Sequence, residues 1–212
     1  MQKTTTNPKE GNASCCGSAG LADITGCRMS LYPLCDNFAG IILDSVAKVD
    51  ASKVWSSTDH LSTVYRGRQL HVLDCARALF VYAWKENVHM AGNFTFSRGC
   101  PKDVDADHFF AADEQPCNAA ALSMGNFYAF AKISFYALNT PDYMEHIRYI
   151  VELAGKHGLK PQTAHYVTML EGSANKLFAF FDEALNYAGQ NLSHYVLEAT
   201  LSVNSPSNAK KA

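Results

Sequence analysis

A segment of about 75 residues occurs twice in this chain, and the duplication restricts the fold more than any single motif does. The copies span residues 27–101 and 131–206. Over most of their length they align at an offset of 105, which pairs Thr58 with Thr163, His60 with His165, Thr63 with Thr168, and Gly67 with Gly172. Near the start the offset is 104, which pairs Ser30, Tyr32 and Leu34 with Ser134, Tyr136 and Leu138. Because there are only two copies and both are long, we predict a duplicated domain with two similar sites rather than a solenoid.

The composition is typical of a compact globular protein. The chain has 212 residues, of which 48% are hydrophobic, and a formal net charge of −2. It lacks the basic excess that nucleic acid or an anionic membrane surface would attract, so we expect no nucleic-acid partner. The apolar runs are short, and residues 1–25 lack the basic start and apolar centre of a secretory signal. These features predict a cytoplasmic protein.

The cysteine pattern favours free thiols over disulfides or a metal site. There are seven cysteines, an odd number, and few lie close together in the sequence. The adjacent pair Cys15-Cys16 has no second ligand pair at zinc spacing and lies in a polar segment. We therefore expect disordered tails at residues 1–25 and 208–212, with no metal and no cofactor.

Each copy shows the pattern strand, helix, strand, strand, helix, strand. In the first copy, residues 28–34 alternate as a strand does, and apolar residues recur at helical spacing after Asp36. In the second, Ser173 is expected to open the last helix and Gly189 to end it. This order predicts an α+β fold of tandem ferredoxin-like (βαββαβ) domains, in which helices cover one face of antiparallel sheets. We place the domains at residues 26–101 and 127–207, joined by a linker at 102–126.

Strand alternation assigns side chains to the two faces of each predicted sheet. The face covered by helices should include Met29, Leu31, Leu61 and Tyr65, and in the second copy Ile133, Phe135, Tyr166 and Leu170. Thr63 and Thr168 interrupt these apolar sets at equivalent positions. A buried hydroxyl costs roughly 1 to 3 kcal/mol without a partner, so each threonine either anchors a ligand or bonds a backbone carbonyl.

The opposite face repeats its polar and aromatic residues, which predicts packing against the other repeat or a second subunit. These residues are Ser30, Tyr32, His60 and His89, with Ser134, Tyr136, His165 and His194 as counterparts. Metal binding by the histidines is a weaker alternative, because no carboxylate or cysteine recurs beside them. Asp59 and His60 are adjacent on a predicted strand and should point to opposite faces, so they do not form a triad with Ser62. The sequence therefore favours binding over catalysis.

Five segments are distinctive: SLYP at 30–33, VWSSTDHLSTVYRG at 54–67, TFSRGCP at 95–101, PDYM at 141–144 and NSPS at 204–207. Together they resemble the YkoF family of thiamine and hydroxymethylpyrimidine binding proteins. The resemblance spans residues 25–207 and implies a homodimer with one ligand pocket per repeat. It also implies a role in thiamine-precursor uptake or salvage, with a thiamine-precursor membrane transporter as a partner.

The resemblance also implies site residues. Leu31 and Thr63 match ligand-contacting positions of the family, and the internal alignment adds their second-copy counterparts. With their neighbours, the predicted ligand-binding residues are Ser30, Leu31, Tyr32, Thr63, Ser134, Phe135, Tyr136 and Thr168, and no catalytic residue is expected. Phe94 stands where the family usually has glycine, which predicts a narrower first pocket. A regulatory sensor of another small molecule, such as an amino acid, is the alternative function, because the fold alone does not select the ligand.

Overall fold

The computed structural model describes residues 24–98 and 113–207. The predicted tails, including the Cys15-Cys16 pair, lie outside the described residues apart from residues 24 and 25, which belong to the first strand. The first part of the predicted linker, residues 102–112, also lies outside the described residues.

Each half of the chain folds in the predicted order. The first half comprises β1 (Ile24–Pro33), α1 (Phe38–Lys48), β2 (Trp55–Thr58), β3 (Thr63–Arg68), α2 (Gln69–Ala83) and β4 (Met90–Arg98). After the short helix α3 (Ala119–Met124), the second half comprises β5 (Tyr128–Leu138), α4 (Tyr143–Lys156), β6 (Gln162–Ala164), β7 (Val167–Ser173), α5 (Ala174–Asn191) and β8 (His194–Val203). The predicted tandem ferredoxin-like fold is confirmed.

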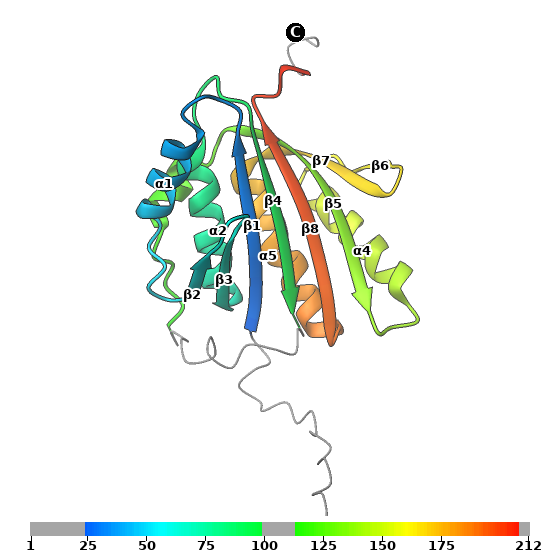
Figure 1. The fold of residues 1–212 in the computed structure, drawn as a ribbon. Helices are drawn as coiled ribbons and strands as arrows, with labels where there is room; N and C mark the ends of the chain where they lie inside the picture. Colours follow the sequence, from blue (N-terminus) through cyan, green and yellow to red (C-terminus); the bar gives the residue numbers. More distant parts are fainter. Residues whose placement is uncertain (1–23, 99–112, 208–212) are drawn as a thin grey trace, which may run out of the picture.

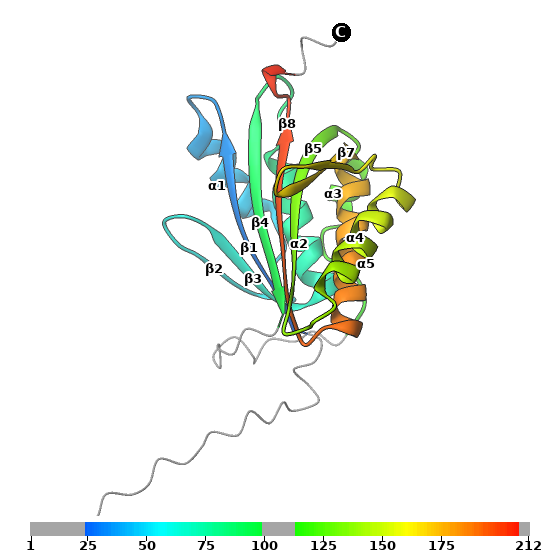
Figure 2. The ribbon, with the colours of Figure 1, turned by 90° about the vertical axis from the view of Figure 1, so that its right-hand side faces the viewer.

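The two halves share one eight-stranded sheet. Its order is β2-β3-β1-β4-β8-β5-β7-β6, so β4 and β8 join the repeats at the centre. All strand pairs are antiparallel. Figure 1 looks onto the face that carries no helix, with α2 and α5 behind the central strands, and Figure 2 shows the sheet and helices as two layers. The repeats are thus fused edge to edge rather than linked as separate bodies.

A single hydrophobic core runs between the sheet and the helices of both halves. Aromatic rings connect α2, β4 and α5 across the join: Phe94 packs edge-on against Phe80 and Phe178, with ring centroids 5.7 and 5.6 Å apart. All three rings are almost fully buried. Such edge-to-face contacts add to the stabilisation from burial. Buried aromatic rings of both repeats therefore contact one another across the join.

Two residues assigned to the covered face are not there. Leu61 is 83% exposed and Tyr166 is 99% exposed, because both lie in hairpin turns rather than in strands. Tyr166 has a positive φ of 69°, which belongs to a turn rather than to a strand. The expectation that strand alternation extends through residues 60 to 62 was wrong.

The described part of the segment between the repeats is fastened to α2 by Asp74, whose side chain is 3% exposed. One carboxylate oxygen accepts hydrogen bonds from the Cys117 N–H at 3.0 Å, and from the Asn118 N–H and side-chain amide at 2.9 Å each. The other oxygen pairs with Arg77 at 2.6 Å. This network compensates the buried charge and positions the start of α3.

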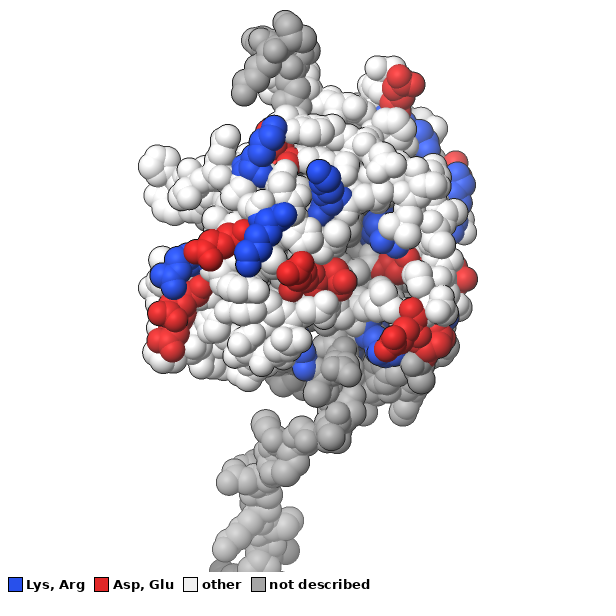
Figure 3. Space-filling view, turned by 180° about the vertical axis from the view of Figure 1, so that it is seen from behind, with Lys and Arg blue, Asp and Glu red and all other residues white. Residues whose placement is uncertain are grey.

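Charged side chains of both signs are interspersed over the helical face (Figure 3). No patch of one sign extends across it, in keeping with the net charge of −2. Within residues 24–98 and 113–207, no helix has the length and apolar character needed to span a membrane.

We predict that Asp74→Ala lowers the free energy of unfolding by roughly 3 to 5 kcal/mol, because it leaves Arg77 and three buried N–H donors without their acceptor. Chemical denaturation monitored by circular dichroism measures the change. The control is Asp44→Ala on the exposed face of α1, which should change stability by no more than about 0.5 kcal/mol. Equal stabilities for the two variants would contradict the structural role of this network.

Candidate functional site: two equivalent cavities

A cavity lies at the same place in each repeat, where the first strand passes beneath the first helix and beside a hairpin. The first, of about 370 Å³, lies between β1, α1 and the β2–β3 hairpin. The second, of about 480 Å³, lies between β5, α4 and the β6–β7 hairpin. Both volumes fall in the range of small-molecule sites.

All eight residues predicted to bind ligand line these cavities. Ser30, Leu31, Tyr32 and Thr63 line the first, and Ser134, Phe135, Tyr136 and Thr168 line the second. Leu31 and Phe135 are buried, whereas the two tyrosines are about half exposed at the rims. The structure thus brings the predicted residues together in two groups of four. Their contact with a ligand stays a prediction.

Further wall residues correspond between the repeats. Phe38 and Ile42 of α1 occupy the positions of Tyr143 and Ile147 of α4, 105 residues later. They give each cavity an aromatic and an aliphatic wall opposite the strand. Sequence reasoning missed these four residues, although the repeat offset, read along the helices, pairs them.

A pair of threonines forms the polar corner of each cavity. The Thr58 and Thr63 hydroxyls lie 3.0 Å apart across β2 and β3. Thr163 and Thr168 face each other at the same register in β6 and β7. A hydroxyl has one donor and two acceptor positions, so such a pair can still offer donor and acceptor capacity to a ligand. The bond of Thr63 to another side chain was not foreseen from the sequence.

The turn over the first cavity is fastened to β1. Asp59 accepts a 2.6 Å ion-pair hydrogen bond from Arg28 and receives the backbone N–H groups of Leu61 and Ser62 at 2.8 and 2.9 Å. The Ser30 hydroxyl donates to the Leu61 carbonyl at 2.7 Å. The Arg28 guanidinium and these N–H groups hold the pKa of Asp59 well below its usual range. We call this group of contacts the turn latch.

The second repeat keeps Ser134 at the position of Ser30 but lacks the other three side chains of the turn latch. The counterparts of Asp59 and Ser62 are Ala164 and Val167, neither of which has a polar side chain, and Lys132 replaces Arg28. The β6–β7 turn therefore presents its exposed Tyr166 at the cavity without these contacts to β5. The two cavities share their walls but differ in how their turns are held.

The second cavity also lies beside a carboxylate. The Tyr136 hydroxyl donates to Glu198 of β8 at 3.4 Å, and a shallow hollow on the open sheet face connects these two residues with Tyr166. The residue corresponding to Glu198 in the first repeat is Asn93. The walls of this hollow therefore carry one carboxylate, Glu198, and one ammonium group, Lys132.

The structure also bears on the excluded catalytic triad, on metal ligation and on the predicted narrowing of the first pocket by Phe94. Asp59 and His60 lie in a turn rather than on a strand, and the carboxylate bonds Arg28 instead of the imidazole. No group of three or more potential metal ligands occurs among the described residues. Phe94 does not narrow the first pocket, because its ring points into the core between α2 and α5.

We predict that Asp59→Ala, which copies Ala164 of the second repeat, loosens the β2–β3 turn. The Leu61 and Ser62 amides should then exchange with deuterium several-fold faster, because both lose their acceptor. Since the folded-state pKa of Asp59 is depressed, the turn latch is intact above the ordinary aspartate pKa of about 3.9 and weakens only as the pH falls below it. Asp36→Ala, at another exposed aspartate, is the control. Unchanged exchange at both amides would show that the turn latch does not hold the turn.

Comparison with known proteins agrees with the two-fold repetition of the fold. The model of the YKOF-related Family matches residues 24–103 and again residues 128–208. The chain is similar to the Bacillus subtilis (strain 168) protein named "Putative HMP/thiamine-binding protein YkoF", with 37% identity over 188 residues. That alignment covers 89% of this chain and 94% of the relative. The chain therefore belongs to the YkoF-related family.

Proposed function

We propose that this protein binds thiamine or its hydroxymethylpyrimidine moiety without transforming it, with one pocket in each repeat. The observation that carries the proposal is the recurrence of the same cavity, with a threonine pair in the same corner, at equivalent positions of the two halves. The name of the Bacillus subtilis relative supports the ligand class.

The walls suit such a ligand. An aminopyrimidine ring is flat and carries ring nitrogens and an amine, so it requires apolar walls and a few hydrogen-bonding groups. In the first cavity, Leu31 and Phe38 supply apolar walls, and Thr63 supplies a hydroxyl. In the second, the larger Phe135 replaces Leu31 and can stack on the ring. The rim tyrosines, Tyr32 and Tyr136, offer aromatic faces to a thiazolium cation.

The cellular role that we propose is uptake or salvage of thiamine precursors in the cytoplasm, next to a thiamine-precursor transporter. Binding without turnover would keep the ligand available to enzymes that use it. A homodimer is part of the proposal, because the sheet face opposite the helices exposes Tyr32, Tyr136 and Met169. A second copy would cover these apolar groups.

We predict that the two cavities bind independently and can be weakened one at a time. Thr63→Ala should weaken binding in the first cavity about fivefold and Thr168→Ala in the second by as much, because each removes one hydrogen-bonding group worth about 1 kcal/mol. Calorimetry with thiamine, hydroxymethylpyrimidine, thiamine phosphates and amino acids measures both sites. Thr63→Ser and Thr168→Ser keep the hydroxyl and should restore affinity.

The ligand panel also separates the alternatives. Recovery of unchanged thiamine by mass spectrometry after incubation is the expected result, and a converted product would contradict a binding role. Binding of an amino acid in these cavities, with no heat from thiamine at millimolar concentration, would favour a sensor of another metabolite. Two-site isotherms that neither alanine variant changes would show that the threonines are structural.

We predict that the protein is a dimer at micromolar concentration, with a sedimentation mass close to twice 23.2 kDa. Met169→Asp, which places charge on the open sheet face outside the two proposed ligand cavities, should shift the equilibrium toward monomer. Glu145→Lys on α4, away from that face, should leave it unchanged. A wild-type monomer would contradict this part of the proposal and leave ligand binding to be judged separately.

A further inference from the structure

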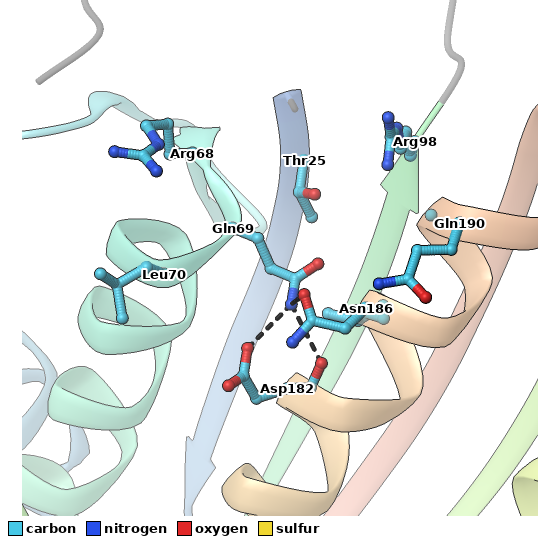
Figure 4. Close-up of a pocket in the computed structure, with 10 residues that line it drawn as sticks. Thr25, Arg68, Gln69, Leu70, Arg98, Asp182, Asn186 and Gln190 are labelled. Carbon is cyan, nitrogen blue, oxygen red and sulfur yellow. Dashed lines mark hydrogen bonds between the residues drawn. The ribbon is translucent and has the colours of Figure 1, made fainter. Parts of the chain in front are cut away.

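A third cavity lies at the join of the repeats, at the end of the molecule where β1 begins and β4 ends. It has a volume of about 380 Å³, and α2, α5, β1 and β4 form its walls (Figure 4). Unlike the two cavities described above, it is lined mainly by polar and charged side chains: Thr25, Arg68, Gln69, Arg98, Asp182, Asn186 and Gln190. We call it the seam cavity.

Hydrogen bonds between the repeats hold its walls together. The Gln69 amide, at the start of α2, donates to the Asp182 carboxylate at 2.8 Å and to the Asn186 side-chain oxygen at 3.0 Å (Figure 4). It also donates to the Asp182 carbonyl at 3.0 Å. The two amide hydrogens of Gln69 are shared among three acceptors on α5, so this part of the cavity wall is preorganised.

Glycine at position 189 leaves space that the Arg98 guanidinium fills in the seam cavity. The sequence suggested that Gly189 ends α5, but the helix continues to Asn191. A Cβ atom at position 189 would collide with a terminal nitrogen of Arg98. Gly189 therefore makes room for a guanidinium rather than stopping the helix. Among the described residues, Arg98 forms no hydrogen bond or ion pair, although it lies near Tyr195.

The duplication provides an internal comparison, because the other half has apolar residues at the same positions. The counterparts of Gly189, Arg98 and Thr25 are Trp84, Val203 and Ala129. Trp84 stacks on Phe127 at 4.8 Å, and both Val203 and Ala129 are buried. One end of the join is thus filled with apolar side chains, whereas the other is hollow and polar. Hydrophobic packing alone would favour apolar side chains at both ends of the join.

A buried polar group beside the seam cavity also indicates a binding site there. Tyr195 is fully buried, and its hydroxyl lies near Thr25 and Arg98 without forming a hydrogen bond of good geometry. An unsatisfied buried hydroxyl is costly, and in native proteins it commonly marks a site for a ligand or water.

We propose that the seam cavity binds the oxyanionic group, carboxylate or phosphate, of a small molecule, with Arg98 as the principal cation. Its charged lining residues are two arginines and one aspartate, which leaves an excess of one positive charge for the anion. Arg68 at the rim already pairs with Glu114 at 3.5 Å, so Arg98 is the more available of the two. The guanidinium geometry matches both oxyanions. Gln190 extends from α5 toward Asn186 and can donate a further hydrogen bond (Figure 4).

The seam cavity is separate from the two cavities proposed for thiamine. Thr25 and Leu31 lie six positions apart on the same strand, which corresponds to about 20 Å. The inference therefore does not depend on the proposed function, and a ligand at the seam would contact both repeats.

Nuclear magnetic resonance on the full-length, ¹⁵N-labelled protein tests the inference. The probes are sodium acetate and sodium phosphate, with sodium chloride at matched ionic strength and acetamide as the neutral analogue of acetate. We expect saturable shifts of the Arg98 Nε and of the Asn186 and Gln190 side-chain amides with acetate or phosphate, and none with the two controls. The tighter of the two probes identifies the oxyanion, and saturating thiamine should leave the shifts unchanged.

Two variants test the residues. Arg98→Gln should weaken binding at least tenfold, whereas Arg148→Gln, an exposed arginine on α4, should not change it. The double variant Arg98→Val, Gly189→Trp copies the filled end of the join and should abolish binding while it preserves the backbone spectrum. Equal shifts with chloride or acetamide, no saturable shift at all, unchanged affinity in Arg98→Gln, or competition by thiamine would each overturn the inference.

Discussion

The antiparallel pairing of β4 with β8 is the interaction on which the rest of the molecule depends. It joins Met90 to Val203 at one end and Arg98 to Tyr195 at the other, so the last strands of the two repeats run side by side along their whole length. Without this pairing, each repeat would leave a long strand at the edge of its sheet. With it, α2 and α5 are brought together over the join, and a single core replaces two small ones. The pairing also places the two proposed ligand cavities on opposite sides of the join.

Duplication lets the two halves be read as variants of each other. Their cavities keep the threonine pairs, the rim tyrosines and the helix positions of Phe38 and Tyr143. They differ at Leu31 and Phe135, at Asn93 and Glu198, and in the turn latch. A pyrimidine ring would meet Leu31 in the first cavity and the larger Phe135 in the second. A cationic ligand would meet Asp59, already paired with Arg28, at the first cavity and Glu198 beside the second. Differences between the sites would thus arise at the walls and rims rather than at the hydroxyl corners.

The order of elements could be predicted because helical and strand periodicities repeat at a fixed offset and support each other. The predicted site residues reached the cavity walls because neighbours on one strand stay together wherever that strand packs. The turn latch and Tyr166 could not be predicted, because residues 59 to 62 and their counterparts resemble the strands that flank them. Gly189 is a different case. Glycine near a helix end usually indicates that the helix ends there. Here α5 continues past Gly189, and Arg98, which is distant in the sequence, fills the space beside it.

The hairpins that wall the proposed ligand cavities are also the outermost strands of the sheet. β2 has four residues and β6 has three, all of them at least partly exposed. Edge strands this short offer few unpaired backbone groups to another chain, so they protect an eight-stranded sheet from edge-to-edge aggregation. In the second repeat, β6 has only three residues and its turn lacks three side chains of the turn latch. This edge of the sheet therefore offers few backbone groups to another chain even though its turn is held by fewer contacts.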